Sequence, residues 1–144
     1  MSSPTITAII VTYNRKKLLE RCLSAITTQT RRPDAVLVID NASTDGTPAW
    51  LHKWMPLHLL QATLIALDQN TGGAGGFAAG MKLAFENGAE WVWMMDDDAE
   101  PHPEALEQLM RVATDPSHVY GSLAVCGDET SWLTTVLNPP LGEV

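Results

Sequence analysis

The feature that most constrains the fold of this chain is a regular alternation of apolar, β-rich runs with segments of helical periodicity. Four runs are predicted as strands, at residues 7–13, 35–39, within 59–67 and at 91–95, and residues 119–126 are predicted as a fifth. Strands that alternate with helices are typical of an α/β fold. We therefore expect a mostly parallel central sheet with right-handed crossovers and helices on both faces.

The first two helices are predicted from their caps and their apolar positions. Asn14 is expected to cap the first helix. The apolar face of that helix consists of Leu18, Leu19, Cys22, Leu23 and Ile26. A short second helix is expected from Pro48 to Trp54, with Thr47 as its N-cap.

The third helix is expected to follow the glycine-rich run at residues 70–80 and to end at Asn87-Gly88. Its apolar face is predicted to consist of Phe77, Met81, Ala84 and Phe85. A fourth helix is expected from near Pro103 to about Val112.

Composition limits the class of protein. The chain has 144 residues, the size of about one domain, and its 45% hydrophobic content favours a globular fold. No apolar run approaches the roughly 18 residues of a membrane span, and the N-terminal segment lacks the basic leader of a signal peptide. Cys22 and Cys126 are expected to be buried free thiols, which favours a cytosolic location.

The charge of the chain argues against a nucleic-acid partner, because the net charge is −8. Six of the nine Lys and Arg residues nevertheless fall within residues 15–32. This cluster is either a solvated helix face or a local positive surface that faces an anionic ligand or lipid.

Polar groups follow three of the predicted strands, where each strand ends. These groups are Thr12-Tyr13-Asn14, Asp40-Asn41 and Asp96-Asp97-Asp98. In parallel sheets, ligands bind beyond the carboxyl ends of the strands. We therefore expect the three groups to converge on one rim of the sheet and to form a ligand site.

The aspartate triplet has the spacing of a cation site. If the backbone stays extended past Met95, Asp96 and Asp98 point to one side and Asp97 to the other. Two such carboxylates suit Mg²⁺ or Mn²⁺, which take one or two protein oxygens and complete their coordination with phosphate and water. The alternative is an Asp-rich loop that caps the next helix.

Asp40 has two compatible interpretations. A single Asp at the end of a parallel strand often binds a ribose or a base edge. The same residue could instead stabilise an Asx-turn within the polar segment at residues 40–47.

The glycine-rich run has three interpretations. Gly73, Gly75 and Ala78 match G-x-G-x-x-A, and Asp96 follows 18 residues later, as in a dinucleotide-binding fold. Alternatively, the glycines let the backbone approach a sugar nucleotide while opening a helix. They could also serve only as small residues for tight helix–sheet packing.

Four segments carry a family resemblance, and they are IIVTYNR at 9–15, VLVIDNASTDGT at 36–47, NTGGAGGFAAG at 70–80 and WVWMMDDDAEP at 91–101. In these segments and their order, the chain resembles the family 2 inverting glycosyltransferases, which have the GT-A nucleotide-sugar fold. The N-x-GG-x-GG form and the aspartate triplet look most like rhamnosyl- and galactofuranosyltransferase-type members, which build bacterial cell-wall polymers or surface polysaccharides.

The resemblance implies roles for matching positions. Thr12 and Tyr13 would line a pyrimidine pocket, and Asp40 would bind the edge of the uracil or thymine ring. Asp96 would contact the ribose or metal-bound water, and Asp98 would ligate the cation. The full implied nucleotide-sugar set is Thr12, Tyr13, Asn14, Asp40, Asn41, Asn70, Gly72, Gly73, Asp96 and Asp97, with Asp96 and Asp98 on Mn²⁺ or Mg²⁺.

The sequence also departs from the family pattern. Family members carry an acidic general base well beyond the D-x-D motif, and this chain ends at Val144. We expect residues 1–144 to be a single nucleotide-sugar-binding domain, truncated on its acceptor side, with the general base beyond Val144.

The predicted function is metal-dependent, inverting transfer of a sugar from a UDP- or dTDP-sugar to a saccharide or lipid-linked acceptor. The expected location is the cytoplasm, including peripheral contact at the inner face of the membrane. The alternatives are a catalytically incomplete nucleotide-sugar-binding module and an NAD-dependent oxidoreductase.

Overall fold

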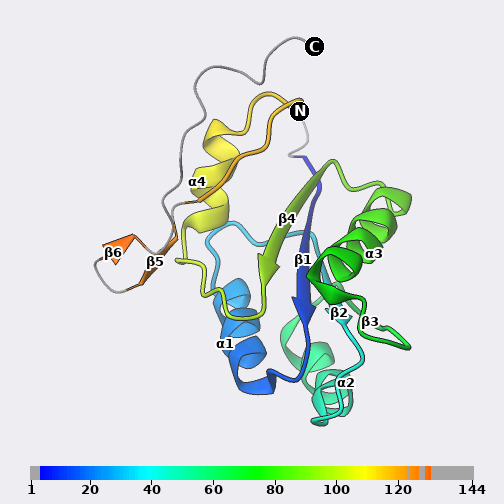
Figure 1. Cartoon of the computed structure of the whole chain (residues 1–144). Helices are drawn as coiled ribbons and strands as arrows, with labels where there is room; N and C mark the ends of the chain where they lie inside the picture. Colours follow the sequence, from blue (N-terminus) through cyan, green and yellow to red (C-terminus); the bar gives the residue numbers. More distant parts are fainter. Residues whose placement is uncertain (1–3, 123, 127–128, 131–144) are drawn as a thin grey trace. The chain divides into compact units, whose positions relative to one another are not determined.

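A parallel four-stranded sheet organises the chain (Figure 1). The computed structural model describes residues 4–122, 124–126 and 129–130, which fall into two units, Met1–Glu107 and Gln108–Val144. The sheet belongs to the first unit and consists of β1 (Ile6–Thr12), β2 (Ala35–Asp40), β3 (Ala62–Ala66) and β4 (Trp91–Asp96). All neighbouring strands are parallel, which confirms the predicted α/β fold.

The strand order is β3-β2-β1-β4. The chain therefore adds β2 and β3 on one side of β1 and then places β4 on the other side. In open α/β sheets, ligands bind where the order of strands reverses in this way. Here that point lies at the carboxyl ends of β1 and β4.

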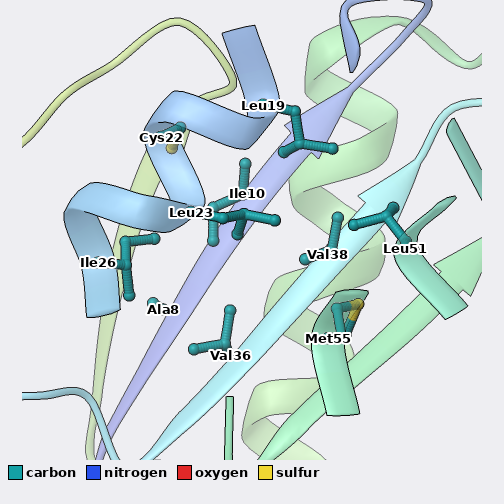
Figure 2. Packing of buried hydrophobic residues seen from close by; sticks show 10 residues of the cluster. All are labelled: Ala8, Ile10, Leu19, Cys22, Leu23, Ile26, Val36, Val38, Leu51 and Met55. Carbon is teal, nitrogen blue, oxygen red and sulfur yellow. The ribbon is translucent and has the colours of Figure 1, made fainter. Parts of the chain in front are cut away.

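Two helices cover one face of the sheet. They are α1 (Lys16–Thr27) and α2 (Thr47–His58), and Figure 2 shows their apolar side chains packed against β1 and β2. The buried cluster on this face comprises Ala8, Ile10, Leu19, Cys22, Leu23, Ile26, Val36, Val38, Leu51 and Met55. The predicted apolar face of the first helix is thus confirmed apart from Leu18, which is 36% exposed.

The opposite face is covered by α3 (Gly72–Glu86), which packs on the buried side chains Ile9, Val11, Leu37 and Ile39. Glycines form part of the contact. A Cβ atom on Gly76 would lie 2.6 Å from Cγ1 of Val11, and one on Gly80 would lie 2.5 Å from Cγ2 of Ile9. These two positions therefore serve the tight helix–sheet packing that was one interpretation of the glycine run.

The apolar face predicted for this helix was partly wrong. Ala84 is buried and Phe77 packs against the cluster, but Met81 is 41% exposed and Phe85 is 83% exposed. The reason is that the helix approaches the sheet through its smallest residues, so its larger apolar side chains lie outside the contact.

The fourth strand is an edge strand, and its apolar side chains are only partly buried. Val92 and Met94 are 40% and 45% exposed, while Trp93 and Met95 pack against the cluster on the α1 and α2 side. Met94 pairs with Ile9 in the register, but α3 lies mainly over β1 and β2. Among the described residues, this face of β4 is therefore only partly covered.

Two predicted helix starts were also corrected. α1 begins at Lys16 with Arg15 at the N-cap, because Asn14 has a φ of 53° and lies in the left-handed region. α2 begins at Thr47 with Gly46 at the N-cap, and it continues past Trp54 to His58.

The remaining elements lie further along the chain. α4 (Ala105–Val112) is close to its predicted range. The predicted fifth strand is instead a two-residue strand, β5 (Val125–Cys126), which pairs antiparallel with β6 (Glu129–Thr130) in a sheet of their own. Cys22 is a buried free thiol as predicted, and the side chain of Cys126 lies outside the described residues. Within the described ranges, every helix is too short or too polar to cross a bilayer.

The packing of α3 makes a prediction about stability. We expect Gly80→Ala to lower the free energy of unfolding by about 1–3 kcal/mol, because the added methyl group collides with Ile9. Gly73→Ala is the matched control. No heavy atom lies within 4 Å of a Cβ at Gly73, so that variant should be neutral or gain up to about 1 kcal/mol of helix propensity. Urea unfolding followed by circular dichroism measures both, and equal stabilities of the two variants would contradict the packing role.

Candidate nucleotide-sugar and metal site

The strand register brings the predicted polar groups together. Thr12 pairs with Asp40 across β1 and β2, and Val11 pairs with Asp96 across β1 and β4. The backbone N–H of Asn41 also donates to the carbonyl of Thr12 at 2.8 Å. The ends of the three strands therefore form one rim, as the sequence had predicted.

The aspartate triplet is divided between solvent and interior. β4 ends at Asp96, and a turn follows in which the backbone N–H of Ala99 donates to the carbonyl of Asp96 at 3.2 Å. Asp96 and Asp98 are exposed, whereas Asp97 is only 3% exposed. Two carboxylates are thus accessible and one is turned inward, but the predicted reason is wrong, because the chain turns after Asp96 and does not stay extended.

The inward carboxylate of Asp97 is held by two partners. The hydroxyl of Thr12 donates to Oδ2 at 2.7 Å, and Nη1 of Arg15 lies 3.3 Å from Oδ1. Both oxygens of Asp97 are therefore engaged within the protein. This geometry favours a positioning role for Asp97, which holds the turn that presents its two neighbours.

Arg15 is the residue of this rim that sequence reasoning missed. Its Nη1 atom lies 3.3 Å from Asp97 and 3.4 Å from Oδ2 of Asp98. The sequence had placed Arg15 only in the basic cluster of residues 15–32. Its position directly after Thr12-Tyr13-Asn14, at the end of the first strand, could have indicated that Arg15 belongs to the rim.

Asp40 is buried at the end of β2 and is 1% exposed. Its Oδ2 atom accepts a hydrogen bond from the backbone N–H of Ser43 at 2.9 Å, so Asp40 stabilises the polar loop through a bond three residues on, one residue further than in an Asx-turn. Within the described part of the chain, Oδ1 of Asp40 is buried without a hydrogen-bond partner. Leaving a buried acceptor unsatisfied costs about 1–3 kcal/mol, so a hydrogen-bond donor at this oxygen would stabilise the protein.

The loops after β1 and β2 are tied to each other. The side-chain oxygen of Asn14 accepts from the backbone N–H of Thr44 at 2.7 Å, and the backbone N–H of Asn14 donates to the hydroxyl of Ser43 at 2.9 Å. Asn14 thus orders the rim, while the neighbouring Tyr13 is 44% exposed and open to solvent.

Asn41 connects the end of β2 to the start of α3. Its amide nitrogen donates to the carbonyl of Gly72 at 2.9 Å, and its amide oxygen accepts from the backbone N–H of Thr71 at 2.8 Å. Asn41 is 2% exposed, so its side chain is committed to the loop. Asn70 is exposed, and its side-chain oxygen accepts from the backbone N–H of Gly72 at 2.8 Å.

The glycine run therefore has two parts. Gly72 has a φ of 73°, and no heavy atom lies within 4 Å of a Cβ built on Gly72 or Gly73. Backbone at these two positions is open to a ligand, in contrast to the packed positions Gly76 and Gly80.

Comparison with known proteins identifies the family. The model of glycosyl transferase family 2 matches residues 7–142, which is most of the chain. The chain belongs to glycosyl transferase family 2. It spans only about a third to a half of the length of the curated relatives that it matches.

Two curated relatives illustrate this similarity. The galactofuranosyltransferase GlfT1 of Mycolicibacterium smegmatis is 38% identical over 120 residues, which cover 83% of this chain and 38% of that protein. The N-acetylglucosaminyl-diphospho-decaprenol L-rhamnosyltransferase of Mycobacterium tuberculosis is 32% identical over 110 residues, which cover 74% of this chain and 36% of that protein.

Solved glycosyltransferases share the fold. The mannosyltransferase PcManGT of Pyrobaculum calidifontis, in complex with GDP-Man and Mn²⁺, matches with a TM-score of 0.72 and 33% identity over 80% of this chain and 34% of that one. Residues 1–349 of S. aureus TarS, in complex with UDP-GlcNAc, match with a TM-score of 0.62 and 27% identity over 72% of this chain and 29% of the other. The sheet and helices of this family 2 domain therefore form the predicted GT-A fold.

The electrostatics of the family 2 site favour a cation. Burial, together with the negative charges of Asp97, Asp98, Glu100 and Asp96, raises the pKa of the Cys22 thiol to about 12. The carboxylates thus create a negative potential that reaches into the core beneath them. A divalent ion at the rim would offset this potential.

Most residues of the basic cluster at residues 15–32 have a partner within the chain, although many of the side chains are exposed. Arg15 contacts the triplet, Arg21 pairs with Glu100, Arg31 pairs with Asp34, and the ammonium of Lys16 lies 5.7 Å from the centre of the Trp50 ring. These contacts argue against a free positive surface and leave a largely solvated helix face with local ion pairs. They assign four of its six cations to local partners.

The donor set fits a hard divalent cation held in part by its ligand. Within the described ranges, no three His, Cys, Asp or Glu side chains gather in a way that could hold a metal ion. Asp96 and Asp98 supply two exposed carboxylates, and Mg²⁺ and Mn²⁺ sites of this kind are completed by phosphate oxygens and water. The residues therefore fit the predicted ion when a diphosphate is present.

The hydrogen bond beneath the triplet makes a second prediction. We expect Thr12→Val to lower the free energy of unfolding by about 1–3 kcal/mol near pH 7, because it leaves the buried Oδ2 of Asp97 without a donor. Thr7→Val is the matched control on the same strand. Thr7 is 7% exposed, and no hydrogen bond to its hydroxyl is present among the described residues.

The two valine variants can be compared by chemical unfolding at neutral pH. A loss of stability confined to Thr12→Val supports the positioning of Asp97 by this hydroxyl. Equal losses in both variants would instead assign the effect to replacing any buried threonine of β1.

Proposed function

We propose that this family 2 domain binds a UDP- or dTDP-sugar together with Mn²⁺ or Mg²⁺ and presents the sugar for inverting transfer to an acceptor hydroxyl. The observation that carries this proposal is the division of the aspartate triplet. Asp97 is fixed in the interior, while Asp96 and Asp98 face solvent on the rim where three strands end. A cation between Asp96 and Asp98 would offset the charge of both carboxylates.

Different residues of the rim would bind different parts of the sugar-nucleotide donor. Asp96 and Asp98 would hold the cation, which when bound offsets the charge of the departing diphosphate. The unpartnered Oδ1 of Asp40 would accept a donor N–H from the pyrimidine ring, beside the end of β1 at Thr12 and Tyr13. Gly72 and Gly73 would let backbone lie against the sugar nucleotide.

Other residues would keep this arrangement rigid. Asn41 fixes the start of α3 by its two bonds to Thr71 and Gly72. Asn14 fixes the loop after β2 through Thr44. Because binding sites gain affinity from pre-organised groups, these contacts should reduce the entropy lost when the donor binds.

We assign donor binding to these residues, and not the removal of the acceptor proton. Inverting transfer needs a base that activates the attacking hydroxyl, and we propose none of the rim residues as that base. This point also favours the alternative of a nucleotide-sugar-binding module that needs further residues for transfer. The NAD-dependent alternative is disfavoured, because its glycine motif opens α3, after the third strand instead of the first.

The relatives suggest the wider process. Galactofuranosyl- and rhamnosyltransferases are among the matches, and the name of the rhamnosyltransferase describes a decaprenol-linked acceptor. We propose on this basis a saccharide or lipid-linked acceptor and a role in cell-wall or surface polysaccharide synthesis, on the cytoplasmic side of the membrane. A mannosyltransferase structure that contains GDP-Man makes GDP the competing donor nucleotide.

The proposal is tested by nucleotide binding with and without Mn²⁺. We expect Asp98→Asn to weaken UDP or dTDP binding at least about tenfold in Mn²⁺ and to leave the weak binding in EDTA unchanged. Glu86→Gln is the control, since it removes one exposed carboxylate at the other end of α3. Isothermal titration calorimetry measures the affinities, and circular dichroism checks the fold.

Two results would count against the proposal. Equal affinities of wild type and Asp98→Asn in Mn²⁺ would remove the metal role of Asp98. Tighter binding of GDP than of UDP and dTDP by the wild type would contradict the pyrimidine pocket at Asp40.

A further inference from the structure

Arg15 places a positive charge inside the proposed cation site. It stands at the N-cap of α1, at the end of the loop that follows β1, and one guanidinium nitrogen lies near two carboxylates. The distances from Nη1 are 3.3 Å to Oδ1 of Asp97 and 3.4 Å to Oδ2 of Asp98. The chain therefore supplies its own counter-ion to the triplet.

The two contacts of Arg15 differ in strength because the two carboxylates differ in burial. The side chain of Asp97 is 4% exposed, and a buried carboxylate needs a nearby positive charge or hydrogen bonds. The side chain of Asp98 is 54% exposed and that of Arg15 is 53% exposed, so solvent screens their attraction. The contact with Asp97 is thus the firm one, and the contact with Asp98 is easily exchanged.

The other basic side chains nearby have different partners. Arg21 pairs with Glu100, and the ammonium of Lys16 lies over the ring of Trp50. Lys17 is exposed, and no ion pair of its side chain is present among the described residues. Of the basic cluster at residues 15–32, Arg15 is the residue whose described contacts reach the triplet.

We propose that Arg15 is a resident cation that holds Asp98 when no divalent ion is bound, and that the divalent ion must displace Arg15 from Asp98 while Arg15 stays on Asp97. This inference rests on the proposed metal role of Asp98. Arg15 is then a positioning residue with a second effect. It relieves the repulsion between Asp97 and Asp98 in the free protein, and it weakens the binding of an ion that arrives without its diphosphate.

The exchange has a measurable consequence for Mn²⁺ alone. With Arg15→Gln, the ion no longer competes with a guanidinium for Asp98, and one neighbouring positive charge is gone. We expect this variant to bind Mn²⁺ roughly two- to fivefold more tightly than wild type, the size of effect that an exposed ion pair supports. Lys17→Gln removes the same charge two residues away without touching the triplet, and near physiological salt its affinity should stay at the wild-type value.

The experiment titrates the purified chain with MnCl₂ in the absence of nucleotide and follows free Mn²⁺ by electron paramagnetic resonance. Thermal unfolding in EDTA and in Mn²⁺ gives a second readout. Arg15→Gln should melt at a lower temperature than wild type in EDTA, because Asp97 loses its charge partner, and it should gain more from Mn²⁺ than wild type or Lys17→Gln.

Should Arg15→Gln fail to fold, Arg15→Lys serves the same test. A lysine ammonium is a single point charge and would stay on the buried Asp97, so this variant should show a smaller gain in Mn²⁺ affinity. The inference is overturned if wild type binds Mn²⁺ and the Arg15 variants bind it equally or more weakly. Absence of Mn²⁺ binding by wild type and all variants would instead overturn the proposed metal role itself.

Discussion

The parallel register of β1 with β2 and β4 is the constraint on which the rest of this structure depends. Because Thr12 pairs with Asp40 and Val11 pairs with Asp96, residues far apart in the sequence end at one edge of the sheet. A shift of either neighbour by one residue would turn its polar end to the other face. The apolar clusters on both faces of β1 and β2 oppose such a shift, so packing in the core fixes the geometry of the rim.

Carboxylates gathered at one rim repel one another, and the structure stabilises the individual carboxylates to different degrees. Asp97 is stabilised internally by a hydrogen bond from the Thr12 hydroxyl and by the positive charge of Arg15. Asp40 keeps one buried oxygen without a described partner, and Asp96 and Asp98 remain exposed. Asp98 has one solvent-screened contact with Arg15, so the groups that the protein satisfies least are among those that the family resemblance assigns to donor and cation. Unsatisfied polar groups of this kind are a common property of binding sites, where a ligand completes them.

Much of this could be predicted from the sequence, because the signals were local. Apolar runs that end in polar residues predicted the strands and the rim. The extended backbone expected past Met95 was wrong, because β4 ends at Asp96 and a turn follows. The contact face of α3 was not predicted. Hydrophobic periodicity is read from apolar side chains, and glycine has no side chain to contribute to the pattern. Gly76 and Gly80 let the helix backbone approach Val11 and Ile9 of β1 closely, and this contact is visible only in the folded structure.

Tertiary placement explains the other differences. One face of β4 is exposed because the strand lies at the edge of the sheet. An apolar run such as WVWMM predicts burial equally for a central strand and for an edge strand, so the sequence does not distinguish them. Arg15 lies 82 residues from Asp97 in the chain, so no local pattern connects them. Asn14 is a residue type that often caps helices, but its backbone is left-handed and its side chain bonds to Thr44 instead.

The central claim is that the rim binds a divalent cation and that this cation binds the diphosphate of the donor. The most direct test is a crystal structure with Mn²⁺ and UDP or dTDP, with data collected at the manganese absorption edge. The account predicts one anomalous peak in contact with a carboxylate oxygen of Asp98 and a diphosphate oxygen, with Asp96 beside it and the base against Asp40. Manganese and nucleotide bound elsewhere, with Asp96 and Asp98 facing bulk solvent, would contradict it.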